Sequence, residues 1–172
     1  MKRLFFALWP DDTTRQKIDC INRKIDQKGL KKLQPTNLHA TLVFLGNVDD
    51  KTADAVQKAA AFIKAAPFTL KFNELNFWPK PRILCLTCRK QPKPIYVLVN
   101  ALTRMVLEHS VRLGNKRPYR AHITLARKAT ANPPLEFGAI EWSADSFALV
   151  QSRSTDKGVC YEVIDSWPLS KV

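Results

Sequence analysis

The chain has 172 residues, 45% of them hydrophobic, and a formal net charge of +13 from 28 basic and 15 acidic side chains. This length fits one folded domain and the apolar fraction supplies a packed interior, which excludes a disordered chain. The basic excess favours a polyanionic partner, either nucleic acid or an anionic membrane surface, over a solvated basic face without a binding role. We expect a single domain over residues 1–172.

The first apolar run is too short to act as a signal sequence or a membrane span. It covers Leu4 to Trp9 and ends at Pro10. A signal core or a membrane helix needs a longer run, and no other segment approaches about eighteen apolar residues. We therefore expect a cytoplasmic protein without a membrane partner.

In chain order the apolar pattern alternates between strands and helices. Period-two or continuous apolar runs predict strands, and apolar residues at helical spacing predict helices. The expected elements are strand 2–9, helix 12–28, strand 38–46, helix 50–66, strands 68–78 and 82–89, helix 92–113, strand 119–127 and a hairpin of 142–154 with 159–167. This order predicts an α+β chain in which each half contains a helix followed by a histidine-bearing strand.

Four cysteines raise the question of a metal or redox site. Cys85 and Cys88 form a C-x-x-C pattern, whereas Cys20 and Cys160 stand alone. Because 82–89 is predicted as a strand, the spacing of three puts the two sulfurs on opposite faces, where they cannot share a metal. We expect reduced thiols and no metal site.

One short pattern occurs twice, about half the chain length apart. Two of the three histidines, His39 and His122, each begin a His-x-Thr-Leu sequence that includes Thr41 or Thr124. On a strand, residues two apart share a face, so each histidine points the same way as its threonine. A pair of histidines can supply an acid and a base, and hydroxyls can donate to an oxygen anion. A single histidine would more simply be a buried structural residue, which is our reading of His109.

The repeated pattern resembles the two-histidine phosphoesterase superfamily and, within it, the RNA 2′,3′-cyclic phosphodiesterases, which are also called 2′-5′ RNA ligases. The resemblance extends almost from end to end, through RLFFALWPDDTTRQKI, NLHATLVFLG, YRAHITLAR and FALVQSRSTDKGVCYEVIDSWPL. One departure is Ala121, because the family often has Pro before the second histidine.

The resemblance implies two pseudo-symmetric lobes of antiparallel sheet, with helices packed outside and a central groove lined by both His-x-Thr strands. It implies a metal-independent, cofactor-free hydrolysis of RNA 2′,3′-cyclic phosphate ends to 2′-phosphomonoesters, with reversible ATP-independent 2′-5′ ligation as the reverse reaction. His39 would donate a proton to the leaving oxygen, and His122 would accept one from the attacking water. Thr41 and Thr124 would hold the phosphate oxygens.

Arg127 ends the second motif, where the family commonly has a basic residue. Strict alternation puts this side chain, five positions after His122, on the opposite face, so it reaches a phosphate only if the strand ends or bulges. Other candidate RNA contacts are basic residues before the second motif and aromatic residues for which core packing is the alternative role: Lys116, Arg117 and Arg120; Trp9, Phe77 and Trp78.

Two alternatives to this function stay open. The same chemistry could act on small cyclic nucleotides or on 2′-5′-linked oligonucleotides. The basic charge alone would also serve a non-catalytic RNA-binding module, although such a module has no need for a repeated histidine and threonine. We expect the protein to act as a monomer on RNA ends bearing a 2′,3′-cyclic phosphate.

Overall fold

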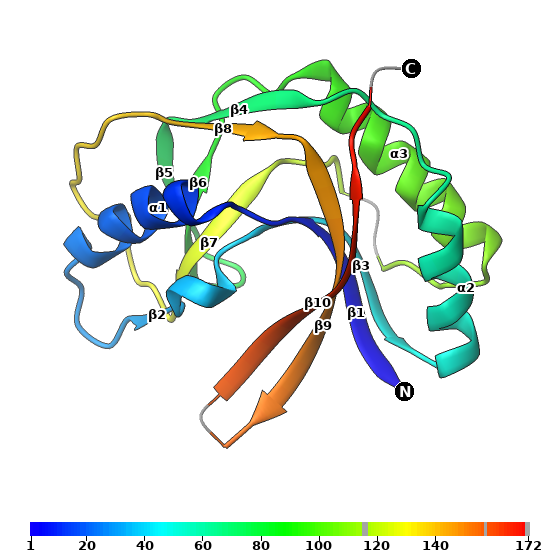
Figure 1. The fold of residues 1–172 in the computed structure, drawn as a ribbon. Coiled ribbons are helices and arrows are strands. Elements are labelled where there is room, and N and C mark those ends of the chain that lie inside the picture. The colour runs from blue at the N-terminus through cyan, green and yellow to red at the C-terminus, as the bar shows by residue number, and fades with distance from the viewer. Residues whose placement is uncertain (115–116, 157, 171–172) are drawn as a thin grey trace.

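The structure is a computed structural model that describes residues 1–114, 117–156 and 158–170. Its elements are β1 (Lys2–Leu8), α1 (Asp12–Lys24), β2 (Lys31–Lys32), the 3₁₀ turn η1 (Pro35–Asn37), β3 (Ala40–Val48), α2 (Asp50–Ala60), β4 (Phe68–Phe72), β5 (Glu74–Trp78), β6 (Ile83–Thr87), α3 (Lys93–Glu108), β7 (His122–Arg127), β8 (Ile140–Ala144), β9 (Ser146–Thr155) and β10 (Gly158–Pro168). Figure 1 shows a strongly twisted sheet with helices on its outer side. The predicted α+β class is confirmed.

The two motif strands are neighbours at the centre of the main sheet. Its strand order is β10-β9-β1-β3-β7-β6-β5, with β2 also pairing with β7, and the pairs are antiparallel. In the described ranges, β3 and β7 are paired at one position, Ala40 opposite Ile123. The sheet therefore consists of two halves that diverge from this seam, as Figure 1 shows, and each half presents a motif strand at its inner edge.

The two halves of the sheet do not correspond to the two halves of the sequence. The strands β1 and β3 share one half with β9 and β10, so this half contains both ends of the chain. Helix α3 packs against β3. In α1, the Asn22 side-chain amide donates a hydrogen bond to the carbonyl oxygen of Leu125 in β7 at 3.2 Å. Helices α1 and α3 therefore each contact the motif strand from the other half of the sequence.

Strand β1 is buried on both faces because it lies in the middle of the sheet. Leu4, Phe6 and Leu8 point into the main core, while Phe5 and Ala7 join a smaller apolar cluster on the opposite face. This explains why LFFAL is a continuous apolar run rather than an alternating one. The smaller cluster lies beneath His39, since the rings of Phe5 and His39 are 4.9 Å apart.

Several predicted boundaries were wrong. Segment 68–78 is two strands, because the chain passes at Asn73 from β4, which pairs with β8, to β5, which pairs with β6. The expected strand 142–154 divides in the same way at Asp145, with residues 142–144 in β8 and 146–154 in β9.

The three helices are also shorter than predicted, ending at Lys24, Ala60 and Glu108. Proline disfavours a helical conformation at the residue that precedes it, and the second helix ends well before Pro67. After the third helix, Ser110 has a positive φ of 62°, which takes the chain out of the helical path. No helix in the described ranges is long and apolar enough to cross a membrane.

Candidate active site

The structure brings all five predicted site residues to one cavity of about 330 Å³. His39 directly precedes β3, and His122 is the first residue of β7. Both line the cavity together with Thr41, Thr124 and Arg127. The cavity lies at the seam between β3 and β7, where the two halves of the sheet separate.

Both imidazole rings are held by the same local hydrogen bond. His39 Nδ1 lies 2.7 Å from the carbonyl oxygen of Asn37, and His122 Nδ1 lies 2.9 Å from the carbonyl oxygen of Arg120. A carbonyl oxygen can only accept, so each Nδ1 carries the hydrogen and donates it. Each Nε2 is thereby left for the reaction. That of His39 lies 3.0 Å from the Thr41 hydroxyl, which donates to it when the ring is neutral.

Asn37, whose carbonyl oxygen accepts the hydrogen bond from His39, is itself held by two other elements. The Asn37 side chain is buried, donates to the carbonyl oxygen of Val159 at 2.7 Å and accepts the backbone N–H of Tyr161 at 3.2 Å. These bonds attach η1 to β10. Arg15 of α1 attaches the same turn through bonds to the carbonyl oxygens of Pro35 and Leu38. The sequence shows Asn37 only as part of a turn, so its role as a support for His39 was missed.

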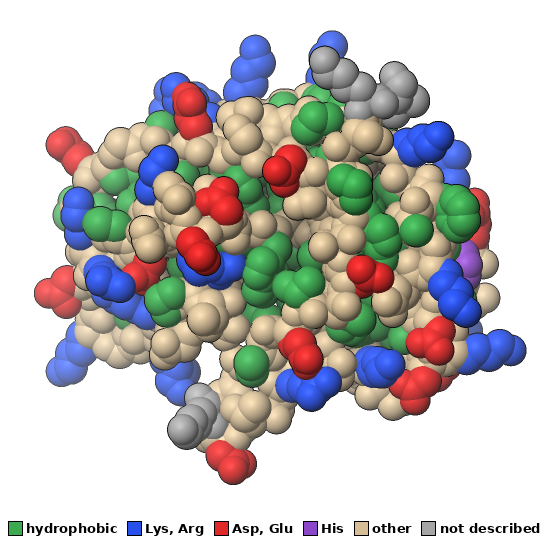
Figure 2. All heavy atoms as spheres, in the orientation of Figure 1, with side chains coloured by type: hydrophobic (Ala, Val, Ile, Leu, Met, Phe, Trp, Pro, Cys, Tyr) green, Lys and Arg blue, Asp and Glu red, His purple; other side chains and the backbone are tan. Residues whose placement is uncertain are grey.

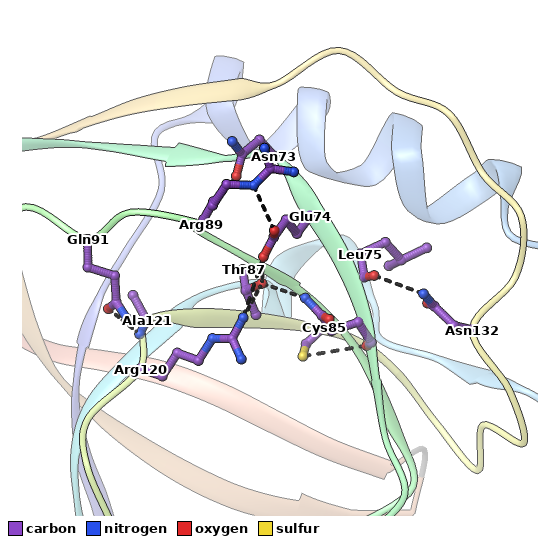
Figure 3. Close-up of polar contacts among 11 residues, drawn as sticks. Asn73, Glu74, Leu75, Cys85, Thr87, Arg89, Gln91, Arg120, Ala121 and Asn132 are labelled. Atoms are coloured by element: carbon purple, nitrogen blue, oxygen red, sulfur yellow. Dashed lines mark hydrogen bonds and ion pairs between the residues drawn. The ribbon is translucent and has the colours of Figure 1, made fainter.

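A separate polar network supports His122 (Figure 3). The Arg120 guanidinium lies 3.5 Å from Glu74 Oε2 and 3.3 Å from the hydroxyl oxygen of Thr87, which is fully buried. The backbone N–H of Ala121 donates to Gln91 Oε1 at 2.7 Å. Proline, frequent in the family at this position, has no N–H for this bond. Arg120, predicted as an RNA contact, is thus engaged within the protein.

Arg127 reaches the cavity because β7 contains a bulge. Ala126 is opposite Leu84 and Thr124 is opposite Cys85, so Leu125 is an extra residue in β7. An extra residue reverses the alternation beyond it, which returns Arg127 to the face of His122. The carbonyl oxygen of Leu125 accepts from the backbone N–H of Leu33 at 2.8 Å and from Asn22.

Aromatic side chains cover both imidazoles. The Trp9 ring stacks on His39 at 5.7 Å between centroids, and the Trp78 ring is 4.6 Å from that of His122. Tyr161 meets His39 edge-on at 5.1 Å. Phe77 instead packs against the main core. Two of the three aromatic candidates therefore shield the histidines. Arg117 lines a separate cavity, and Lys116 lies outside the described residues.

Burial lowers the pKa of both histidines. The pKa of His39 falls to about 4, with desolvation as the largest cause and the Asn37 carbonyl opposing the shift. The positive charges of His122, Arg15 and Arg127 contribute to the same lowering. Burial also lowers the pKa of His122, against the hydrogen bond to the Arg120 carbonyl. At neutral pH both imidazoles are therefore mainly neutral in the ligand-free protein.

The remaining histidine and the cysteines lie apart from this cavity. His109 follows α3 and its Nδ1 donates to the carbonyl oxygen of Met105 at 2.9 Å, a structural cap. The four cysteines are free, and burial raises the pKa of Cys85 to about 12 and that of Cys88 to about 11. Among the residues that the structure describes, no three His, Cys, Asp or Glu side chains are grouped as metal ligands.

Known proteins resemble this chain in both sequence and fold. A sequence model of LigT-like phosphoesterases matches residues 8–85. The RNA 2′,3′-cyclic phosphodiesterase of Bacillus subtilis is 32% identical over 151 residues, covering 81% of each chain. The chain therefore belongs to the family of LigT-like phosphoesterases. The Escherichia coli RNA 2′,3′-cyclic phosphodiesterase is 28% identical over 173 residues, 99% of this chain and 98% of that protein.

Solved structures extend the match to the whole fold. The crystal structure of E. coli LigT in apo form has a TM-score of 0.87 and 28% sequence identity, and covers 99% of this chain and 98% of that one. A structure of E. coli LigT complexed with 3′-AMP has a TM-score of 0.86 at 26% identity with the same coverage. The family resemblance drawn from the paired motifs is confirmed.

Titration of the imidazoles by NMR tests the electrostatics of the empty pocket. The signal of His39, assigned by its loss in His39→Gln, should have a midpoint near pH 4. Inorganic phosphate should raise this midpoint, because an anion in the cavity stabilises the imidazolium. A midpoint near 6.5, unchanged by phosphate, would show that neither burial nor the neighbouring cations control this histidine.

Proposed function

We propose that the two histidines of this cavity hydrolyse RNA 2′,3′-cyclic phosphate ends, the substrate that names the curated relatives. The observation that carries the proposal is the matched tether of the two rings. Each Nδ1 donates to a carbonyl oxygen two residues earlier, so both Nε2 atoms are available to one cavity. That cavity also presents two hydroxyls and a guanidinium, the donors that a phosphate needs.

The two motif strands suit an in-line displacement at phosphorus. In such a reaction the attacking and leaving oxygens lie on opposite sides of the phosphorus, and each needs its own proton-transfer group. His122 accepts a proton from water as the water oxygen bonds to phosphorus. The bond from phosphorus to the ribose 3′ oxygen breaks, and that oxygen takes the proton of His39. The products are a 2′-phosphomonoester and a free 3′ hydroxyl.

The remaining donors stabilise the phosphate while its charge rearranges. Thr41 and Thr124 donate to the nonbridging oxygens, and Arg127 supplies a fixed positive charge. The bound anion also raises the pKa of His39, which gives the acid its proton when the substrate is present. Because these groups supply both proton transfer and charge stabilisation, the reaction needs no metal ion. Run in reverse with a ribose hydroxyl as nucleophile, the same steps join RNA ends through a 2′-5′ bond without ATP.

Product analysis tests the reaction and its regiochemistry. In the presence of a chelator, an oligoribonucleotide ending in 2′,3′-cyclic phosphate should gain one water by mass spectrometry and keep its phosphate on the 2′ oxygen. A 3′-phosphate product would contradict the assigned leaving oxygen. Loss of activity that added zinc or magnesium restores would contradict the metal-free mechanism.

Replacing the histidines tests the assignment of the pair. His39→Ala and His122→Ala should each lower kcat by about a hundredfold or more, the typical scale of general acid or base catalysis. The double variant should lose much less than the product of the two factors, since both groups act in one transition state. Thr41→Val and Thr124→Val should each cost less, because other donors still hold the phosphate.

His109→Ala is the matched control for these replacements. His109 caps α3 away from the cavity, so turnover should stay within about twofold of the wild-type value. A loss as large as that of His39→Ala would show that the repeated motif does not identify the catalytic pair.

The pH profile tests the pKa shifts under turnover. In the active form, His39 is protonated and His122 is neutral. Because His39 has the lower pKa, this is the less populated of the two forms that carry a single proton. A plot of kcat/KM should be bell-shaped, with its maximum between about 4 and the lowered pKa of His122, below the ordinary 6.5. The kcat profile should lie at higher pH, since the bound phosphate raises both pKa values. Coincident profiles centred above 7 would contradict this assignment.

A further inference from the structure

A second hollow of about 540 Å³ opens directly from the histidine cavity. We call it the side groove. It lies between the β2–η1 segment on one side and the β9–β10 hairpin on the other, and Figure 2 shows the molecule notched beside this protruding hairpin. It shares five lining residues with the histidine cavity, so the two spaces are continuous: Arg3, Leu33, Arg127, Ser152 and Tyr161.

The side groove is lined by positive charge without a compensating carboxylate. Arg3, Lys31, Lys32 and Arg127 line it, and no Asp or Glu does so among the residues described. Within that part of the chain, none of these four side chains forms an ion pair with a carboxylate. Lys32 follows Lys31 on the strand and points to the other face, where its Nζ donates to the carbonyl oxygen of Arg23 at 3.1 Å. The side groove therefore presents three cations to solvent or to an anion: Arg3, Lys31 and Arg127.

Two of these cations are directly opposite each other on neighbouring strands. Lys31 of β2 pairs in register with Arg127 of β7, so their side chains lie on the same face. Like charges in this arrangement repel and destabilise the strand pair. An anion between the two side chains would remove this repulsion, so a bound polyanion would stabilise the pairing of β2 with β7.

Hydrogen bonds within the protein fix the two walls of the side groove relative to each other. Asn37 bonds to Val159 and Tyr161, which fixes η1 to the hairpin on the opposite wall. A different hollow is lined largely by apolar side chains such as Val43 and Val99, and Arg117 is the one cation that lines it among the residues described. Of these two hollows, the side groove is the one that suits a phosphodiester backbone.

We propose that the side groove binds the phosphodiester backbone of the nucleotides that precede the cyclic phosphate. This inference rests on the proposed function, which places the cyclic end in the histidine cavity. Arg127 and Arg3, which line both spaces, then contact the terminal phosphate at the junction, and Lys31 contacts a preceding one. The chain is accordingly selective for RNA ends over free nucleoside 2′,3′-cyclic phosphates.

The test compares two substrates in two charge-matched variants. The substrates are a hexaribonucleotide ending in 2′,3′-cyclic phosphate and a nucleoside 2′,3′-cyclic phosphate. The variant K31E changes the side groove, and K51E makes the same charge change at an exposed position of α2. In the first, the kcat/KM ratio of hexamer to nucleotide should fall about tenfold, because a phosphate contact is replaced by a repulsive carboxylate. In the second it should stay within about twofold.

Equal ratios in the two variants would overturn the proposal, because the effect would then be one of net charge. A direct binding assay keeps the test independent of turnover. For a fluorescent hexamer with a 3′ hydroxyl, the slope of log affinity against log salt should become less steep by about 0.7 in K31A, the value of one contact on a single strand. An unchanged slope would overturn the proposal too. If neither cyclic substrate is hydrolysed while this slope changes, the proposed function fails but the side groove still binds RNA.

Discussion

Two hydrogen bonds set the chemistry of this molecule: each histidine of the pair donates from Nδ1 to the carbonyl oxygen two residues before it. Each bond fixes one tautomer and directs the other ring nitrogen to the same cavity. The two carbonyls are held by unrelated means. Asn37 is attached to the hairpin strand β10, whereas Arg120 is attached through its side chain to Glu74 and Thr87. The two motifs are therefore alike in the first contact of the imidazole and different in what supports it.

The position of the seam explains why a cavity exists in the middle of a continuous sheet. The strands β3 and β7 pair at Ala40 and Ile123 and then diverge, which leaves space between the two motifs. The bulge at Leu125 also turns the Arg127 side chain toward this space. Groups held in place before the substrate binds need little reorganisation during the reaction. Burial by Trp9 and Trp78 keeps the imidazoles neutral until an anion enters.

The parts of the site that follow from local pattern were predictable from the sequence. The spacing of His39 and Thr41, repeated at His122, predicted side chains on common faces, and the family resemblance predicted a groove shared by both motifs. The structure places these side chains in one cavity. The face of Arg127 was not predictable, because it depends on a bulge held by the distant Asn22 in α1. The support from Asn37 was hidden for the same reason, since its partners lie more than a hundred residues away along the chain. Long strands were predicted at 68–78 and 142–154 because apolar alternation does not show where a chain passes from one sheet to another.

The tautomers of the two histidines test this account most directly. Nitrogen-15 NMR of the imidazoles at a pH above both pKa values distinguishes a proton on Nδ1 from a proton on Nε2. The account predicts that His39 and His122 are both neutral with the proton on Nδ1, since each Nδ1 faces a carbonyl oxygen that can only accept. A proton on Nε2 of either ring would mean that its tether is absent in solution, and the matched pair would not exist.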